Sequence, residues 1–209
     1  MRRTVDATQQ GKTLLITFDA VSLSFGGRKL FDGVTLNLRG GQIIGVTGVN
    51  GAGKSTFLKV AGKILPPDSG SVTLPAGSTI AAVSPELKLY DALTAEENLI
   101  FFAKLRGKTL TAEKISELGE RVGLDVKTFA AVRTENFSTG MRQRLKFAVL
   151  LSVDADIWLL DEPTANLDDE GREKFFAEIQ TAAPEKIILL ATNDKLEEKI
   201  CDEIIRLPL

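Results

Sequence analysis

The chain of 209 residues contains no histidine and a single cysteine, Cys201. One thiol excludes an internal disulfide, and without histidine a zinc cluster of cysteine and histidine ligands is excluded as well. Cys201 lies between Ile200 and Asp202, and we expect it to pack in the core.

Long apolar runs and an excess of basic residues are also missing. No run approaches the ~18 consecutive apolar residues that a membrane-spanning helix needs, and no apolar segment follows the N-terminal arginines as in a signal sequence. We therefore expect a cytoplasmic chain. The formal net charge is -2, and lysines and arginines do not cluster with aromatic residues, so nucleic acid is not an expected partner.

The apolar content of the chain is sufficient for one compact domain with a small subdomain. Apolar residues make up 44% of the sequence, so a disordered chain is not expected. No internal repeat is present, so each motif described below occurs once in the chain.

A glycine-rich stretch, GVTGVNGAGKSTF, occupies residues 45–57. Residues 43–47 predict a short buried strand, and the following residues predict a helix because apolar side chains recur at nearly helical spacing up to Ile64. The segment from Gly48 to Ser55 fits the pattern G-x-x-x-x-G-K-[ST]. This order of strand, loop and helix is typical of a phosphate-binding loop.

The residue types of this loop suit the binding of a nucleoside triphosphate. Glycines lack a β-carbon, so the backbone N–H groups can wrap phosphates at the positive end of a helix. Lys54 is expected to reach the β- and γ-phosphates, and Ser55 to ligate Mg²⁺. The expected phosphate-contacting residues are Gly48, Asn50, Gly51, Ala52, Gly53, Lys54, Ser55 and Thr56.

A second motif, ADIWLLDEPTANLDD, occupies residues 155–169. Its apolar run predicts a central parallel strand that ends in Asp161 and Glu162. Beside a phosphate loop, Asp161 can hold Mg²⁺ through water, and Glu162 can polarise the water that attacks the γ-phosphate.

A third motif, ENFSTGMRQRLKFAVLLS, lies between the first two at residues 135–152. With it, the chain resembles the ATP-binding cassette (ABC) ATPases, in which a serine-glycine motif opens a helix before the strand that bears the acidic pair. Ser138 and the N–H groups near Gly140 would form a second anion site, which in that family faces ATP held by a second subunit. The S-x-G-M-x-Q-R variant is similar to that of exporter-type subfamilies.

The resemblance implies an α/β P-loop fold with a mostly parallel core sheet, an antiparallel N-terminal β subdomain and an inserted helical subdomain. Residues 1–85 and 153–209 would form the nucleotide-binding core, and residues 86–152 the helical part. It also implies that Phe25 stacks on adenine and that a loop ending in Asp168 crosses between subunits. Parallel strands are expected at three apolar runs, which begin at Ile43, Ile157 and Ile187.

Two helices of the helical part have their own sequence signals. Thr94 and Glu97 predict a capping box for a helix bearing Leu99, Phe102 and Leu105. The apolar positions Ile115, Leu118 and Val122 predict a second helix, which ends at Gly123.

The chain departs from the family pattern at three places, of which the first is Thr139 and Met141, in place of the first glycine and the glutamine of the commonest signature. Pro85 stands where the family has a glutamine that ligates magnesium and senses the transmembrane partner, so Glu86 or Ser84 must substitute or the contact is missing. Asn193 stands where the family has a histidine beside the γ-phosphate. Asparagine can donate a hydrogen bond but does not titrate near neutral pH, so we expect slower hydrolysis that depends on Glu162, with Lys54 and Asn193 as the other catalytic residues.

The resemblance implies an ATPase subunit that uses ATP and Mg²⁺ to power transport through a separate integral membrane subunit. Two such ATPase subunits, identical or different, would close on ATP at the inner face of the cell membrane, and export is favoured over import. Two alternatives remain open: a soluble ABC ATPase without a transport role, and a degenerate cassette that binds ATP for regulation.

Overall fold

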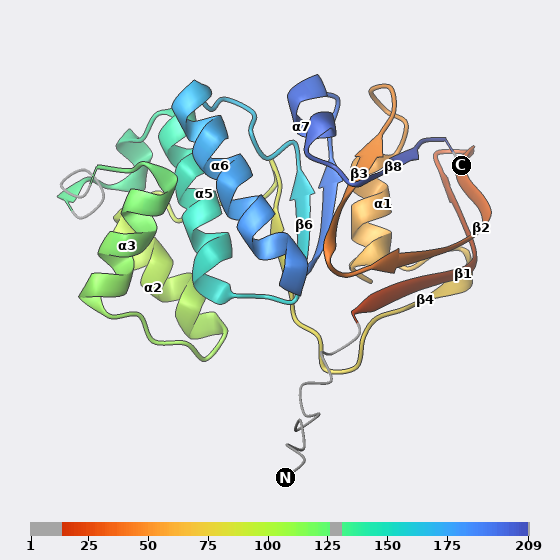
Figure 1. The fold of residues 1–209 in the computed structure, drawn as a ribbon, viewed down its shortest axis with the longest axis horizontal. Coiled ribbons are helices and arrows are strands. Elements are labelled where there is room, and N and C mark those ends of the chain that lie inside the picture. The colour runs from red at the N-terminus through yellow and green to blue at the C-terminus, as the bar shows by residue number, and fades with distance from the viewer. Residues whose placement is uncertain (1–13, 126–130, 209) are drawn as a thin grey trace, which may run out of the picture.

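The computed structural model describes residues 14–125 and 131–208, which form two sheets and the helices around them (Figure 1). Among these residues, no helix combines the length and apolar character needed to cross a membrane. The strands are β1 (Leu15–Phe25), β2 (Arg28–Arg39), β3 (Gln42–Thr47), β4 (Ser69–Thr73), β5 (Ile80–Val83), β6 (Ile157–Asp161), β7 (Ile187–Ala191) and β8 (Glu203–Arg206).

The larger sheet has five strands in the order β5-β6-β7-β3-β8, and the neighbouring strands pair in parallel. Its central strands are apolar along almost their whole length, and β7 is buried at every position, as expected for a sheet covered on both faces. The prediction of parallel strands at Ile43, Ile157 and Ile187 is confirmed.

The smaller sheet is antiparallel and has the order β2-β1-β4. Its register pairs Phe18 with Leu36 on β2 and with Val72 on β4. The sheet lies beside α1 (Figure 1), where Phe18 stacks on Phe57 with the ring centroids 5.1 Å apart. The antiparallel N-terminal region expected from the sequence is therefore present.

The helices are α1 (Lys54–Ala61), α2 (Ala95–Leu105), α3 (Ala112–Val122), α5 (Thr139–Val153), α6 (Asp169–Ala182) and α7 (Lys195–Lys199), with short 3₁₀ turns at Thr134–Asn136 and Ala183–Glu185. The predicted capping box of α2 is confirmed, since Thr94 accepts from the Glu97 N–H and Glu97 accepts from the Thr94 N–H. The predicted end of α3 is also confirmed, because Gly123 is left-handed with φ 70°.

One helix is shorter than its apolar pattern predicts. The pattern runs to Ile64, but α1 ends at Ala61, and Ile64 is 60% exposed. After the C-cap at Gly62, Lys63 has a positive φ of 55°, which turns the chain away from the helix axis.

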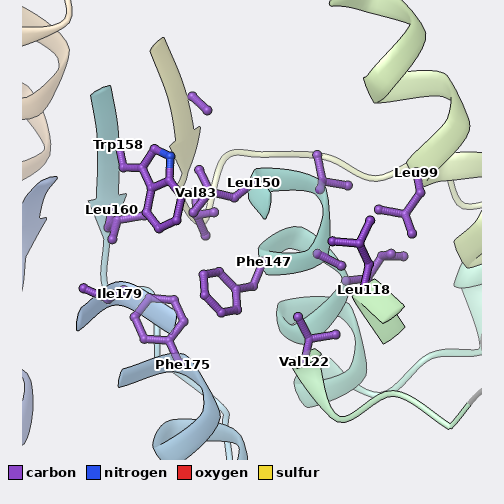
Figure 2. Packing of buried hydrophobic residues seen from close by; sticks show 14 of the residues in the cluster. Val83, Leu99, Leu118, Val122, Phe147, Leu150, Trp158, Leu160, Phe175 and Ile179 are labelled. Carbon is purple, nitrogen blue, oxygen red and sulfur yellow. The ribbon is translucent and has the colours of Figure 1, made fainter. Parts of the chain in front are cut away.

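A large apolar cluster joins α2, α3 and α5 to the parallel sheet and to α6 (Figure 2). Phe147 of α5 packs on Phe175 of α6 with the ring centroids 4.3 Å apart, and Trp158 of β6 is 2% exposed. These helices gather on one side of the molecule (Figure 1), while subdomain boundaries at residues 86 and 152 stay a prediction.

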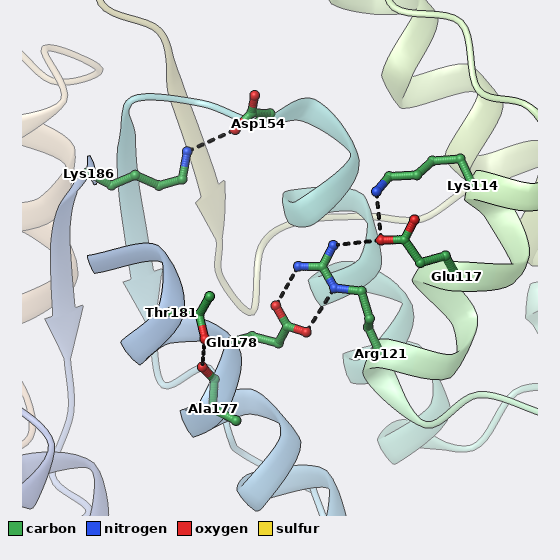
Figure 3. Close-up of polar contacts among 8 residues, drawn as sticks. All are labelled: Lys114, Glu117, Arg121, Asp154, Ala177, Glu178, Thr181 and Lys186. Carbon is green, nitrogen blue, oxygen red and sulfur yellow. Dashed lines mark hydrogen bonds and ion pairs between the residues drawn. The ribbon is translucent and has the colours of Figure 1, made fainter. Parts of the chain in front are cut away.

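Polar contacts add a second connection between the same parts of the chain (Figure 3). The Arg121 guanidinium of α3 donates through Nε to Glu178 of α6 at 2.8 Å and also pairs with Glu117. Near β7, Lys186 donates to Asp154 at 2.9 Å, which is the main cause of the lowered pKa of that carboxyl. Since α3 and α6 are far apart in the sequence, periodicity gave no sign of this pairing.

Cys201 is only partly buried, although it packs against the large apolar cluster. Burial raises the pKa of its thiol to about 12, with smaller contributions from neighbouring carboxylates that include Glu197. The thiol therefore stays protonated at neutral pH and is a poor nucleophile.

Candidate functional site

Four loops meet at one edge of the parallel sheet, because they follow the carboxyl ends of neighbouring parallel strands. The phosphate loop follows β3, and the acidic pair follows β6. Asn193 follows β7, and the segment containing Pro85 follows β5. The sheet order therefore brings together residues from four distant parts of the sequence.

The phosphate loop has the backbone that its glycines permit. The glycines at positions 48, 51 and 53 all have positive φ, at 152°, 78° and 100°. Gly53 is the N-cap of α1 and offers no side-chain acceptor, so the first N–H groups of the helix are free to bind an anion. Lys54 is 7% exposed, and its Nζ donates to the carbonyl of Gly48 at 3.0 Å.

A cavity of about 450 Å³ is lined by the loop, and a second cavity, of about 500 Å³, shares only Glu162 with it and lies between the segment after β5 and the start of α5. Phe25 lines the loop cavity and is 74% exposed, so its ring is available for stacking. The loop cavity is lined by Phe25, Arg28, Leu30, Asn50, Gly51, Gly53, Lys54, Ser55, Thr56 and Glu162. Ala52 lies outside this lining and is 1% exposed, so only its backbone can contact a ligand.

The two acidic residues at the end of β6, Asp161 and Glu162, line different cavities. Glu162 is exposed and lies in the left-handed region with φ 48°, and its N–H donates to the Ala191 carbonyl at 2.9 Å. It lines both the cavity of about 500 Å³ and the loop cavity of about 450 Å³. Asp161 lines a smaller cavity of about 140 Å³ together with Ser55, Ser84 and Glu86. Ser55 and Asp161 offer the hydroxyl and carboxylate oxygens that suit Mg²⁺, whereas Lys59 and apolar residues form much of the remaining wall. The oxygen donors of this cavity therefore fit that ion only on the side of Ser55 and Asp161.

Asn193 contacts the phosphate loop directly. Its Nδ2 donates to Oδ1 of Asn50 at 2.6 Å. The amide therefore lies at the loop where the family resemblance places a histidine, and it offers a donor that does not titrate.

The start of α5 is built as the serine-glycine motif predicts, but it lies apart from the phosphate loop. Ser138 is the N-cap and accepts from the Met141 N–H at 3.2 Å. A β-carbon on Gly140 would lie 2.9 Å from the carbonyl oxygen of Asn166, so only glycine fits beneath that loop. Neither Ser138 nor Gly140 lines the cavity at the phosphate loop.

Asp168 begins α6 and is held by an arginine of α5. Its Oδ1 accepts from the Gly171 N–H at 2.8 Å and from Arg144 at 2.5 Å. The Gly171 N–H is the main cause of the lowered pKa of this carboxyl, and the Arg144 charge adds to it. Arg144 also donates to the carbonyl of Val122 at the end of α3, at 2.9 Å.

Sequence reasoning missed two residues of this region. Arg144 was visible only as part of the Q-R pair, with no sign that it joins two helices to Asp168. Glu197 of α7 is 2% exposed and accepts from the Thr164 N–H at 3.1 Å and from its hydroxyl at 2.5 Å. Burial raises the pKa of Glu197. No sequence pattern indicates this contact, because Glu197 lies in a short and strongly charged segment.

The two candidates for the role of the missing glutamine have different surroundings. Glu86 is exposed and pairs with Lys59 of α1 at 2.8 Å. Ser84 is partly buried and lines the small cavity that Ser55 and Asp161 also line.

The sequence matches a family model described as ABC transporter over residues 31–165, which is more than half of the chain. It is 33% identical over 187 residues to the ABC transporter ATP-binding protein NatA of Bacillus subtilis, covering 82% of this chain and 75% of that protein. It is 29% identical over 204 residues to the linearmycin resistance ATP-binding protein LnrL of the same species, covering 91% of this chain. The chain spans 65% of the length of LnrL.

The fold is also similar to solved structures. One is the dimeric structure of MJ0796, described as a bacterial ABC transporter cassette, with a TM-score of 0.80. The alignment covers 92% of this chain and 94% of that chain at 23% identity, a level that supports the fold alone.

Proposed function

This chain belongs to the ABC transporter family and is an ATPase cassette of that family, and from this premise we propose that it powers transport through a separate transmembrane subunit. The observation that carries the proposal is the meeting of the phosphate loop, the acidic pair and Asn193 at one sheet edge. The relative LnrL is named for linearmycin resistance, which favours export.

ATP binding is assigned to the phosphate loop and Phe25. The free N–H groups at the start of α1 and the Lys54 ammonium provide positive charge for the phosphates. Phe25 is exposed at the same cavity and can stack on the adenine. Lys54 would exchange its contact with the Gly48 carbonyl for phosphate oxygens.

Mg²⁺ is assigned to the small cavity beside the phosphate loop. Ser55 and Asp161 are the residues that would hold it, Asp161 through water, because both line that cavity. When bound, the ion would neutralise charge on the phosphate oxygens. Ser84 is the better placed replacement for the missing glutamine, since Glu86 is engaged with Lys59.

Hydrolysis is assigned to Glu162. It lines the cavity of Lys54 and Ser55, so its carboxylate can accept a proton from water beside the terminal phosphate. Asn193 can donate a hydrogen bond to that phosphate and keeps Asn50 in place before ATP arrives. At position 193 the chain therefore has an amide, which does not titrate, in place of the histidine of the family pattern.

A second cassette is needed to complete the site. Ser138, Gly140 and Asp168 do not line the phosphate-loop cavity of their own chain, which supports a role against ATP on a second subunit, identical or different. ATP would close such a pair, and hydrolysis would reopen it. With a membrane subunit as the further partner, the pair would lie on the cytoplasmic face of the membrane.

A regulatory cassette that binds ATP without turning it over is the second candidate, favoured by Pro85 and Asn193. The test compares Mg²⁺-dependent phosphate release by the wild-type chain and by Glu162→Gln, where loss of a general base lowers kcat about 10²–10⁴-fold. Turnover that the variant loses supports the transporter ATPase, and a wild-type chain that binds ATP without turnover supports the regulatory cassette.

The transport role needs its own experiment. The tagged chain is purified from gently solubilised membranes of its native cell, and the proteins bound to it are identified by mass spectrometry. An integral membrane protein at equal stoichiometry supports the proposal. Active chain that copurifies only with non-membrane proteins would instead support an ABC ATPase without a transport role.

A further inference from the structure

The segment from Ser84 to Leu87 connects the parallel sheet to the helices on one side of the molecule. The Leu87 N–H donates to the Ser84 carbonyl at 3.1 Å and closes a turn there. Pro85, in the middle of the turn, has neither an N–H nor a polar side chain. Polar contacts from this turn to its neighbours therefore depend on its carbonyl groups, on the Ser84 hydroxyl and on Glu86.

Lys146 of α5 donates hydrogen bonds to two carbonyl groups of this turn. Its Nζ lies 3.0 Å from the Ser84 oxygen and 3.4 Å from the Pro85 oxygen. Among the residues that the structure describes, no carboxylate pairs with Lys146, and its ammonium donates to the two carbonyl oxygens instead. Burial lowers the pKa of Lys146, and the Arg142 charge lowers it further. These carbonyl contacts compensate in part for the burial of the ammonium.

A second lysine holds the other side of the turn. Lys59 of α1 pairs with Glu86 at 2.8 Å, with side chains that are 37% and 72% exposed. Exposed ion pairs of this kind contribute little, so this contact is the weaker of the two. The two lysines come from the helices that begin at the phosphate loop and at the serine-glycine motif.

The same turn forms part of the wall of a cavity that Glu162 also lines. Pro85, Lys146 and Glu162 are all among the lining residues of this cavity of about 500 Å³. A shift of the turn relative to α5 would therefore change the surroundings of the Glu162 carboxylate.

We propose that Lys146 is a positioning residue that ties the turn at residues 84–87 to α5, so that this turn and α5 move as one body during the ATPase cycle. The turn lacks a polar side chain at position 85, and Lys146 makes the connection through backbone carbonyls instead. Lys59 supplies the weaker tie to α1. The structural tie stands on the contacts above, whereas its effect on turnover rests on the proposed ATPase function.

The test compares Lys146→Met, which removes the donor but keeps the length, with Lys146→Arg, whose guanidinium can donate to both carbonyls. Lys114→Met is the matched control, since the ammonium of this helical lysine pairs at the surface with Glu117 of its own helix. Hydrogen exchange at residues 84–89 is measured without nucleotide. Losing a charge-assisted hydrogen bond should speed exchange there roughly tenfold in Lys146→Met, with Lys146→Arg and Lys114→Met close to wild type.

Steady-state kinetics on the same proteins test the effect on catalysis. In Lys146→Met, kcat should fall roughly fivefold or more while KM for ATP changes less than about twofold, since the interaction acts on the transition state and not on ATP binding. Lys146→Arg should restore kcat. If Lys146 had only a structural role, Lys146→Met would lower stability without lowering kcat selectively over KM, and Lys146→Arg would not restore kcat.

Several results would overturn the proposal. Unchanged exchange at residues 84–89 in Lys146→Met would show that the turn is not tied to α5. Faster exchange with an unchanged kcat would remove the positioning role. If Lys146→Met does not fold, Lys146→Gln takes its place in both measurements. A wild-type chain without turnover would contradict the proposed function, and the exchange experiment would still decide on the tie.

Discussion

At the residue scale, Lys54 has the most sharply defined surroundings. It is 7% exposed, and its ammonium is held by a single carbonyl of the phosphate loop, at 3.0 Å. A nearly buried cation with one neutral acceptor gains strongly from an anionic partner. This combination explains why a phosphate can displace the Gly48 carbonyl.

Lys54→Ala should therefore abolish measurable ATP binding. Charge-assisted hydrogen bonds contribute about 1.5–3 kcal/mol each, so losing even one raises Kd roughly 10- to 150-fold. Titration with a fluorescent ATP analogue measures the change, and Lys104→Ala, at the end of α2, is the control. Affinity within threefold or so of wild type in Lys54→Ala would contradict the assignment of the loop.

Asn193 gives a prediction about pH. Asn193→His should raise kcat and add an ionisation near ~6.5 to the pH profile of kcat, because imidazole titrates there and asparagine does not. The profiles of wild type and variant are compared across about pH 5.5–8.5. The wild-type profile should lack the step that the variant gains. Two profiles of the same shape would show that position 193 does not face the reacting phosphate.

Glu197 gives a prediction about stability. Burial raises its pKa, so the folded chain binds this proton more tightly than the unfolded chain does. Its contribution to stability is then complete below the unfolded pKa, near ~4.3, and is lost as pH rises through the raised folded pKa.

Glu197→Gln cannot titrate, so its free energy of unfolding should rise relative to that of wild type as pH increases from about 5 to 8. Urea denaturation at each pH measures the difference. Glu198→Gln on the same helix is the control, because it removes a carboxyl group and leaves the buried one. If the difference in free energy of unfolding between wild type and Glu197→Gln did not vary with pH, the raised pKa of Glu197 would be contradicted.

At the element scale, local signals predicted the helix ends that depend on neighbours in sequence. The reciprocal cap at Thr94 and the left-handed Gly123 follow from residues within one turn, and both were predicted correctly. The end of α1 was predicted wrongly, because Ile64 continues the apolar spacing of the helix but lies at the surface. Apolar spacing cannot show where a helix leaves the sheet it packs on.

The capping box allows a matched comparison within one part of the chain. Thr94→Ala removes the hydroxyl that accepts from the Glu97 N–H and leaves the reciprocal bond, from the Thr94 N–H to the Glu97 carboxylate, without its companion. Thr111→Ala removes a single bond from the Lys114 N–H that has no reciprocal partner. N-cap losses cost about 0.5–2 kcal/mol, and Thr94→Ala should lie at the upper end of this range and Thr111→Ala at the lower end. Chemical denaturation measures both. An equal or reversed order would contradict the assignment of the box.

At the scale of the whole molecule, parallel pairing could be predicted but side-chain connections could not. Apolar runs at Ile43, Ile157 and Ile187 predicted the central strands, and their carboxyl ends necessarily share an edge. Contacts such as Arg144 with Asp168, or Lys146 with the turn after β5, join segments that no local pattern relates. They depend on how the helices pack on the sheet.

The phosphate loop and the serine-glycine motif of one chain lie in separate places, which bears on how two chains would pair. Gly140 lies beneath Asn166, which precedes Asp168 by two residues in the sequence. None of these three residues lines the cavity that contains Lys54. Each chain thus offers one phosphate loop and one serine-glycine motif in separate places. Two chains placed head to tail would bring each motif against the other chain's phosphate loop.

The most direct test of this account is the mass of Glu162→Gln in solution with Mg²⁺ and ATP, measured by light scattering during gel filtration. With binding intact and hydrolysis blocked, the variant should elute at twice the mass of one chain with ATP and as a monomer with ADP. A double variant with Lys54→Ala should stay monomeric under both conditions. A single-chain mass for Glu162→Gln at saturating ATP would contradict the claim that two such chains share their ATP sites.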